Sequence, residues 1–335
     1  MTASVLERLN QALFEAMDID HRVYLLGEDI IDPYGGAFKV TRGLSTKFPE
    51  RVITTPISEA AIVGIANGMA LRGLRPVVEI MFGDFVTLTA DQLINHAAKF
   101  RWMYNKIDGV PMVVRTPMGG RRGYGPTHSQ SLEKIFLGIP GLKVVAPNTI
   151  GDPGQLLLEA INDDYPVLFI EHKLLYALPQ LTSGQGDLAE FEIHRSGKTY
   201  PNFCLSIPSH KPDITIATYG YNFELVRKAA LDLLMEHEIF TEIVLYSQLS
   251  FFDMEMLFKS LRTTRRLLTV EEGTHSLGWG AEVIARAAEE IDISGNYRFQ
   301  RVAARNLPIA NSAALENAIL PSVQDIVRSA ISLVS

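Results

Sequence analysis

Strand-like and helix-like segments alternate along almost the whole chain, and no other feature restricts the fold as strongly. Several strand-like segments are apolar on both faces, for example residues 76–81 and 112–115. Strands with two apolar faces are typical of parallel sheets that helices cover on both sides. In the first half, helices are expected at residues 3–18, 38–48, 58–71, 85–103 and 155–162. The sequence therefore predicts an α/β fold built from doubly wound sheets.

The alternation is interrupted once, between residues 177 and 211, where Pro, Ser and Gly are frequent. Such a segment is expected to connect domains rather than to join a sheet. The pattern predicts a first domain over residues 1–176, a linker over residues 177–211 and a smaller α/β domain over residues 212–335. A length of 335 residues suits two domains of this kind.

The composition excludes several classes of protein. The net charge is −7 with both signs scattered along the chain, which argues against nucleic acid or an anionic membrane as a partner. The single cysteine, Cys204, builds neither a disulfide framework nor a metal cluster. We expect no membrane span, because no uncharged apolar run reaches about 18 residues. We expect no signal peptide either, because the first residues lead into an amphipathic helix, and the expected compartment is the cytoplasm.

Standard active-site motifs of α/β proteins are absent from the sequence. There is no phosphate-binding G-x-x-x-x-G-K-[ST] loop, no G-x-G-x-x-G turn after a strand and no G-x-S-x-G nucleophile turn. The zinc-binding motif H-E-x-x-H and paired cysteines are absent too. A two-domain α/β chain without these motifs either shares its site with another chain or binds a less common cofactor.

Residues 54–70 join the end of a predicted strand to the start of a predicted helix. Ser58 can cap this helix, which places Glu59 in its first turn. A carboxylate at this position can simply complement the helix dipole. It can also face a ligand, because α/β folds bind ligands at the carboxyl edge of the sheet. The position alone leaves both interpretations open.

The same helix carries small residues on one face, at Ala60, Gly64 and Gly68. Each glycine costs about 1 kcal/mol of helix propensity. Close approach of another backbone would offset this cost, and that backbone could belong to the same subunit or to another one.

An ordered set of short segments resembles the beta subunits of thiamin diphosphate-dependent 2-oxoacid dehydrogenases, such as those for pyruvate and branched-chain 2-oxoacids. The set covers nearly the whole chain, in the family's order and spacing. Its segments are Gly27-Glu-Asp, Gly35-Gly-Ala-Phe-Lys-Val-Thr-Arg-Gly-Leu, Thr55-Pro-Ile-Ser-Glu, Gly73-Leu-Arg-Pro-Val-Val-Glu, Asp91-Gln, Thr127-His-Ser-Gln-Ser-Leu-Glu, Pro140-Gly-Leu-Lys-Val-Val-Ala-Pro, Val167-Leu-Phe-Ile-Glu-His-Lys-Leu-Leu-Tyr, Val270-Glu-Glu-Gly and Leu320-Pro-Ser-Val-Gln-Asp-Ile-Val. The resemblance implies a pyrimidine-binding, transketolase-like first domain and a second domain like the C-terminal domain of transketolase.

The resemblance also implies thiamin diphosphate as the cofactor. Glu59 matches the glutamate that hydrogen-bonds the aminopyrimidine ring and thereby promotes loss of the thiazolium proton. Phe85 matches the aromatic residue that stacks on this ring, and Met81 is expected to form a further wall of the pocket. His128 matches the active-site histidine that orients the 2-oxoacid and assists proton transfer to the acyl acceptor.

Further assignments concern charged residues around this site. Glu28 and Asp91 match acids of a polar tunnel that links two cofactor sites in relatives, and Glu28 is also expected beside the cofactor. Some relatives carry an acid or an amide where this chain has Leu88, so the proton relay is expected to differ here. Arg121 and Arg122 lie in a Gly-rich loop and could attract an anionic substrate or remain solvated. A structural monovalent cation such as K⁺ is expected near Met112, Ala160 and Asp163.

The diphosphate-binding motif of the family, which opens with Gly-Asp-Gly and closes with Asn, is absent from this sequence. In the family this motif lies on a separate alpha subunit, which also holds Mg²⁺. We therefore expect an α2β2 heterotetramer with each cofactor between an alpha and a beta subunit. Pyruvate is the expected 2-oxoacid, and its acyl group is expected to pass to a lipoyl group of the acyltransferase component.

Two alternatives remain open. The chain could serve another two-chain thiamin enzyme, such as an acetoin dehydrogenase, a split transketolase or a specialised acyl-transfer enzyme, because Glu59 would act in each of them. Residues 190–210, which are extra sequence relative to the family, leave room for such a specialised member. The chain could also be a non-catalytic structural subunit, although the joint presence of Glu59, Phe85 and His128 argues against that.

Overall fold

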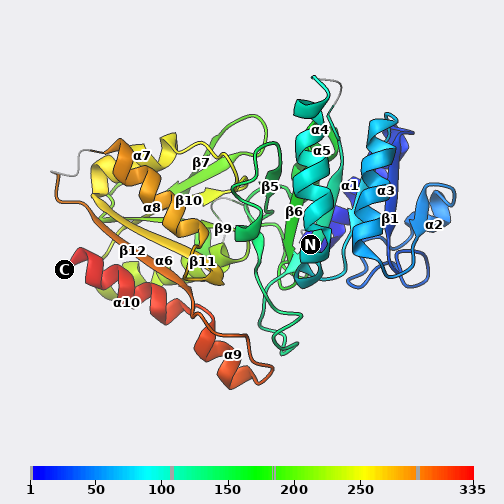
Figure 1. The fold of residues 1–335 in the computed structure, drawn as a ribbon. Helices are drawn as coiled ribbons and strands as arrows, with labels where there is room; N and C mark the ends of the chain where they lie inside the picture. Colours follow the sequence, from blue (N-terminus) through cyan, green and yellow to red (C-terminus); the bar gives the residue numbers. More distant parts are fainter. Residues whose placement is uncertain (1–2, 106–108, 183, 185, 292–294) are drawn as a thin grey trace. The chain divides into compact units, whose positions relative to one another are not determined.

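The computed structural model describes residues 3–105, 109–182, 184, 186–291 and 295–335. The chain divides into two compact units (Figure 1). The first comprises residues 1–119 and 127–180, and the second comprises residues 120–126 and 181–335. None of the described helices combines the length and the apolarity needed to cross a membrane.

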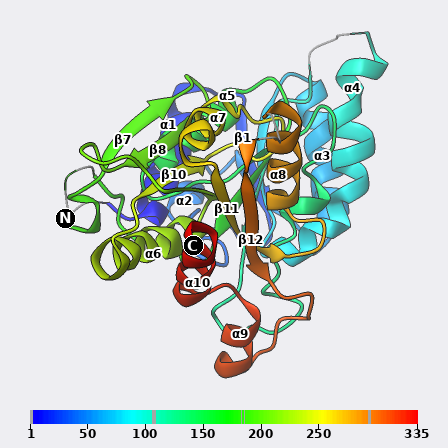
Figure 2. The same ribbon diagram turned by 90° about the vertical axis from the view of Figure 1, so that its left-hand side faces the viewer.

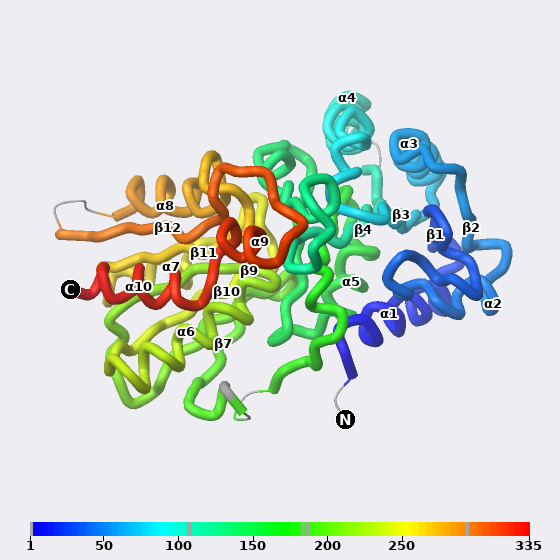
Figure 3. The backbone as a smooth tube through the Cα atoms, turned by 90° about the horizontal axis from the view of Figure 1, so that it is seen from below, coloured from blue at the N-terminus to red at the C-terminus, as the bar shows by residue number. Residues whose placement is uncertain are grey.

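The first unit is built on a six-stranded parallel sheet with the order β2-β1-β3-β4-β6-β5. Its strands are β1 (Val23–Gly27), β2 (Val52–Thr54), β3 (Arg75–Glu79), β4 (Val113–Met118), β5 (Lys143–Val145) and β6 (Val167–His172). Its α-helices are α1 (Val5–Ile19), α2 (Leu44–Lys47), α3 (Glu59–Leu71), α4 (Ala98–Met103) and α5 (Pro153–Asn162). Figure 3 shows α3 and α4 on one face of this sheet and α1 and α5 on the other. The predicted parallel α/β fold is confirmed for this unit.

The predicted helix over residues 38–48 is reduced to the short helix α2. Gly43 precedes α2 with φ +86°, a left-handed conformation that ends any helix running into it. Oδ1 of Asp32 accepts a hydrogen bond from the Gly43 N–H at 2.7 Å, and Oδ2 accepts from the Thr46 N–H at 3.0 Å and the Thr46 hydroxyl at 2.6 Å. Asp32 thus satisfies N–H groups at the start of α2, and the helix begins there because a carboxylate from an earlier turn caps it.

Replacing Asp32 with Ala should lower the free energy of unfolding by about 1–2 kcal/mol, as expected for a lost helix cap. These hydrogen bonds, led by the Thr46 side chain, lower the pKa of Asp32 from 3.8 to about 2. A lowered folded-state pKa means that the stabilisation is complete above the unfolded-state value and disappears as the pH falls through about 2. Urea unfolding of both proteins at pH 7 and near pH 2 measures this. An equal midpoint for the two proteins at pH 7 would contradict the capping role.

The single long helix predicted over residues 85–103 is divided into three pieces. It consists of the 3₁₀ helix η1 (Gly83–Thr89), the π-helical segment η2 (Gln92–Ala97) and α4. The Thr87 hydroxyl donates to the Asp84 carbonyl at 3.0 Å, and the Thr89 hydroxyl donates to the Val86 carbonyl at 2.7 Å. Hydroxyls bonded three residues back favour tighter turns than the α-helix, which apolar periodicity alone does not reveal.

The second unit has a six-stranded sheet with the order β12-β11-β9-β10-β8-β7. Its strands are β7 (Glu192–Ser196), β8 (Asn202–Ser206), β9 (Ile214–Tyr219), β10 (Thr241–Tyr246), β11 (Arg266–Thr274) and β12 (Arg298–Ala304). Its α-helices are α6 (Asn222–His237), α7 (Glu255–Thr264), α8 (Trp279–Glu290), α9 (Ala313–Ile319) and α10 (Val323–Val334). The strands β9 to β12 are parallel, and α7 and α8 cover the face opposite to α6 and α10 (Figure 1).

Strands β7 and β8 lie within the range 177–211, which the composition predicted to be a linker. They form an antiparallel hairpin, and β8 pairs with β10, so this range completes the second sheet (Figure 2). Phe203 and Leu205 point into the core and are buried, whereas most of β7 is exposed. An edge strand with little buried apolar surface has a weak sequence signal, which explains why the hairpin was not predicted.

Candidate active site

Three predicted site residues follow three neighbouring strands of the first sheet. Glu28 comes directly after β1, Glu59 is the first residue of α3 after β2, and Met81 comes two residues after β3. In the sheet, β1 lies between β2 and β3. The chain runs from β1 to β2 on one side and then crosses over to β3 on the other side, so the carboxyl ends of β1 and β3 flank a topological switch point. Open α/β sheets bind their ligands in the crevice at such a point.

Glu28 and Glu59 form a pair of buried carboxyl groups, with only 5% and 7% of each residue exposed. The backbone N–H of Ser58 donates a hydrogen bond to the Glu28 carboxylate. Burial raises the pKa of Glu28 above its usual value, and the negative charge of Glu59 raises it further. The Oε1 atom of Glu28 is buried and has no hydrogen-bond partner among the described residues. The pair therefore has an unsatisfied polar atom at the edge where a ligand is expected.

Phe85 and His128 are brought together, although they lie 43 positions apart in the sequence. Their ring centroids are 5.1 Å apart at an interplanar angle of 82°, and the Phe82 ring contacts His128 in the same edge-on way at 4.9 Å. Nδ1 of His128 lies 3.0 Å from the Thr127 hydroxyl. Phe85 belongs to η1, which packs against α3, the helix that begins with Glu59. Phe82, which the sequence analysis did not single out, is therefore part of the wall around His128.

Two family models match the chain in the same order as the two sheets. The model for the transketolase pyrimidine binding domain matches residues 2–179, and the model for the transketolase C-terminal domain matches residues 205–326. A protein of Oryza sativa named pyruvate dehydrogenase E1 component subunit beta-2, mitochondrial, is 38% identical over 328 residues, covering 98% of this chain and 85% of that protein. This chain belongs to the beta subunits of thiamin diphosphate-dependent 2-oxoacid dehydrogenases.

Three further proteins extend the comparison. The pyruvate dehydrogenase E1 component subunit beta of Saccharomyces cerevisiae is 35% identical, covering 98% of this chain and 88% of that protein. The beta subunit of the acetoin:2,6-dichlorophenolindophenol oxidoreductase of Cupriavidus necator is also 35% identical, covering 96% and 94%. A solved structure titled "Split gene transketolase, inactive beta4 tetramer" has a TM-score of 0.74 at 19% identity, covering 100% of this chain and 99% of that one, and supports the fold.

Arg121, predicted to attract substrate in this beta subunit, is engaged within the second unit. Its backbone N–H donates to Oε1 of Glu316 at 2.7 Å, and its guanidinium donates to Oε2 of Glu272 at 3.3 Å and to the Pro321 carbonyl at 2.6 Å. Glu272 and Glu316 are themselves buried. These bonds favour a structural role for Arg121. Arg122 is exposed, and its attraction of substrate stays a prediction.

Asp91 and Leu88, which bear on the predicted proton relay, both lie on the surface of the isolated beta subunit. The Asp91 side chain is 60% exposed, accepts a hydrogen bond from Asn95 at 2.8 Å and lies 3.4 Å from Nε2 of His96. Leu88 is 56% exposed. Asp91 has no hydrogen bond or ion pair with Glu28 within the described chain, so the structure does not join the two acids, and a relay through Asp91 stays a prediction.

The predicted monovalent-cation site involves Met112, Ala160 and Asp163. The Met112 and Ala160 carbonyls accept backbone N–H groups at 2.9 and 3.3 Å. The Asp163 carbonyl, like that of Ile161, accepts from the Arg75 guanidinium at 2.9 Å, and its carboxylate accepts from Nζ of Lys143 at 2.6 Å. The Arg75 and Lys143 side chains already bond oxygens of Asp163, and the Met112 and Ala160 carbonyls already accept backbone N–H groups, so the residues present do not favour an additional ion. The K⁺ site stays a prediction without support from this geometry.

A buried charge cluster within the first sheet was not predicted from the sequence. Arg115 on β4 makes two hydrogen bonds to Glu171 on β6, at 2.7 and 2.8 Å, and one to Glu79 on β3, at 2.9 Å. The Tyr176 hydroxyl donates to Glu171 at 2.5 Å. Burial raises the pKa of Glu79, and the adjacent Arg115 guanidinium opposes this rise. A signal was present in the sequence, because Glu79, Arg115 and Glu171 lie in otherwise apolar strands, and buried charges must be paired.

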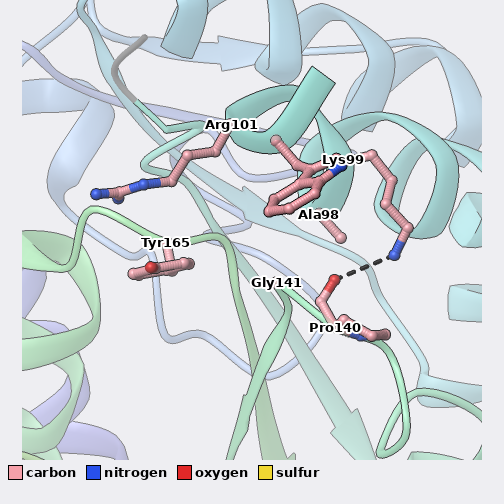
Figure 4. A pocket seen from close by; sticks show the side chains of 7 residues that line it. Ala98, Lys99, Arg101, Pro140, Gly141 and Tyr165 are labelled. Carbon is pink, nitrogen blue, oxygen red and sulfur yellow. Dashed lines mark hydrogen bonds between the residues drawn. The ribbon is translucent and has the colours of Figure 1, made fainter. Parts of the chain in front are cut away.

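A pocket of about 620 Å³ lies beside α4 (Figure 4). In Figure 4, Nζ of Lys99 donates to the Pro140 carbonyl, at 3.1 Å. The Arg101 guanidinium lies over the Tyr165 ring, 4.6 Å from its centroid. None of the residues predicted to bind cofactor or substrate lines this pocket, which is formed by Ala98, Lys99, Arg101, Trp102, Pro140, Gly141 and Tyr165.

Proposed function

We propose that this beta subunit completes the active site of a pyruvate dehydrogenase-type enzyme, which decarboxylates a 2-oxoacid and passes the acyl group to a lipoyl acceptor. The observation that carries the proposal is the buried pair of Glu28 and Glu59 at the switch point of the first sheet, with one carboxyl oxygen unsatisfied. Burial and the charge of the Glu59 carboxylate both raise the pKa of Glu28, so Glu28 can hold a proton beside Glu59. This arrangement suits a group that must hold and release a proton at the edge of a bound ring.

The residues present fit the pyrimidine half of thiamin diphosphate. When bound, this cofactor supplies the electron sink that decarboxylation of a 2-oxoacid requires. Glu59 would bond a ring nitrogen and keep a proton at that atom, and Glu28 would lie beside the same group. Phe85 and Met81, both half-buried, would cover the ring. His128, held between Phe82 and Phe85, would orient the substrate carboxylate and move a proton to the acyl acceptor.

The diphosphate half and Mg²⁺ would be held by an alpha subunit in an α2β2 heterotetramer. Within the described part of the chain, no group of three or more His, Cys, Asp or Glu side chains is arranged to bind a metal ion. The outer face of α3 supports a partner, because Gly64 and Gly68 are exposed there and Ile65 is 55% exposed. A Cβ added at Gly68 would meet no described atom within 4 Å, so packing inside this chain does not account for that glycine. A second subunit on this face would.

The proposal is tested by producing the chain together with its cognate alpha subunit. We expect the complex to bind thiamin diphosphate with Mg²⁺ in calorimetry, and the beta subunit alone to bind at least about 10-fold more weakly, a difference of about 1.4 kcal/mol. We expect pyruvate to be decarboxylated faster than branched-chain 2-oxoacids, and faster than acetoin or a sugar phosphate is cleaved, with an artificial oxidant as the acceptor. Absence of cofactor binding by the complex would indicate a structural subunit.

A second candidate is the beta subunit of an acetoin-cleaving enzyme, which the 35% identity to the Cupriavidus necator protein favours. The site pair of Glu28 and Glu59 does not distinguish the two substrates, because part of the substrate pocket would lie on the alpha subunit. Faster turnover of acetoin than of pyruvate in the same assay would establish this alternative.

A further inference from the structure

The loop that leads to His128 is closed at its base within the first unit. The Gly119 N–H donates to the Gln130 carbonyl at 3.3 Å, which joins the two ends of the segment between them. Oδ1 of Asp84 then accepts from both the backbone N–H and the side-chain amide of Gln130, at 3.2 and 2.8 Å. Asp84 is 7% exposed, so this anchor lies in the interior.

Lys173 bridges the same two ends. Its side chain is fully buried, and Nζ donates to the Gly119 carbonyl at 2.7 Å and to the His128 carbonyl at 2.5 Å. One ammonium group therefore holds the backbone on both sides of residues 120–127. A buried ammonium is costly unless it is hydrogen-bonded, so these carbonyls and the residues around them determine where it lies.

Lys173 also contacts the aromatic wall of the site. Its Nζ lies 5.3 Å from the centroid of the Phe82 ring, and the same ring contacts the imidazole of His128 at 4.9 Å. The amine thus reaches His128 by two routes, directly through the backbone carbonyl and indirectly through Phe82. An interaction between an ammonium and an aromatic face is strongest where water is excluded, as it is here.

Gly119, at the base of the loop, makes this close packing of the backbone possible. Gly119 has φ +91°, and a Cβ added there would lie 2.0 Å from Nε2 of His172. The imidazole of His172 therefore packs against the Gly119 backbone, and its Nδ1 accepts from the Leu174 N–H at 3.1 Å. Only glycine permits both the left-handed conformation and this close approach.

We propose that Lys173 is a positioning residue for His128: its buried ammonium fixes the foot of the 119–130 loop and the Phe82 ring, so that the imidazole is held where the acyl-transfer step needs it. The inference rests on the proposed function, in which His128 acts. It assigns a task to a residue that contacts neither substrate nor cofactor in the proposed site. A displacement of a catalytic group by about 1 Å can cost about 100-fold in rate.

The test uses the assembled alpha–beta complex with Lys173→Met, which keeps the length of the side chain and removes the charge and the donors. We expect kcat for transfer to the lipoyl acceptor to fall about 10- to 100-fold, while the affinity for thiamin diphosphate stays unchanged. Hydrogen exchange of the backbone amides of residues 119–130 should become faster. Lys99→Met is the matched control, because Lys99 also donates to a backbone carbonyl of this unit, that of Pro140; it should change neither quantity.

A double-mutant cycle separates positioning from general destabilisation. If Lys173 acts through His128, the variant with both Lys173→Met and His128→Ala should lose no more activity than His128→Ala alone. The inference would be overturned if the activity losses of the two single substitutions multiplied in the double variant. It would also be overturned if Lys173→Met left hydrogen exchange in residues 119–130 unchanged. Should Lys173→Met fail to assemble, Lys173→Gln, which retains a donor, is measured in the same cycle. A wild-type complex without 2-oxoacid turnover would instead overturn the proposed function.

Discussion

Glu59→Gln should lower kcat for 2-oxoacid decarboxylation by about 1,000-fold in the assembled complex, within the range that general acid–base groups contribute. The amide has nearly the same shape as the carboxyl group but cannot take up and return a proton at the buried position of Glu59. The substitution also removes the negative charge that helps to raise the pKa of Glu28, so the pKa of Glu28 should fall toward its usual value. Steady-state kinetics from pH 5 to 8 measure both effects.

Glu255→Gln is the matched control for Glu59→Gln. Glu255 is the first residue of α7, as Glu59 is the first residue of α3, but it is exposed. If Glu59 only complemented the helix dipole, both substitutions would cost at most about 1 kcal/mol of stability and neither would affect turnover. We expect that outcome for Glu255 alone. Near-normal activity of Glu59→Gln, with assembly intact, would remove Glu59 from the proposed site.

Arg115→Met should produce the largest loss of stability. The substitution leaves Glu79 and Glu171 buried without their cation, and breaking a buried ion pair from one side costs about 3–5 kcal/mol. For a unit of this size, that loss lowers the midpoint of thermal unfolding by about 10 °C. The Glu79 carboxyl group should then bind a proton more readily than in the wild type, because the Arg115 guanidinium no longer opposes the effect of burial on its pKa. The variant should therefore regain part of its stability as the pH falls, because protonation favours the folded state when the folded-state pKa is raised.

The control for Arg115→Met is Arg72→Met, which removes an exposed guanidinium from the same unit. An exposed charge contributes little to stability, and the thermal midpoint should change by less than about 2 °C. Circular dichroism of the purified chains gives these midpoints. Similar midpoints for Arg115→Met and the wild type would show that the cluster of Arg115, Glu79 and Glu171 does not stabilise the first unit.

The parallel sheets were predictable from the sequence because a strand buried on both faces must be apolar on both faces. Residues 76–81 and 112–115 carry this pattern, and β3 and β4 lie where it indicated. The edge hairpin of β7 and β8 was not predictable in this way, since β7 is mostly exposed and its pairing with β8 depends on a strand that lies beside β10. A local pattern of apolar residues indicates which residues are buried. It indicates which strands pair only where the pairing also buries apolar side chains.

Some residues of the proposed site could also be predicted from the sequence, and others could not. Glu59, Phe85 and His128 could be singled out from an ordered set of short segments, because the family's spacing is present in the chain itself. The tertiary structure alone decided that Glu28 lies beside Glu59 and that Phe82 and Lys173 surround His128. Those neighbours come from strands and loops far apart in the sequence, and their proximity follows from the order of strands in the sheet. The sequence by itself thus determined which elements form and which residues can do chemistry, whereas folding determined which of those residues meet.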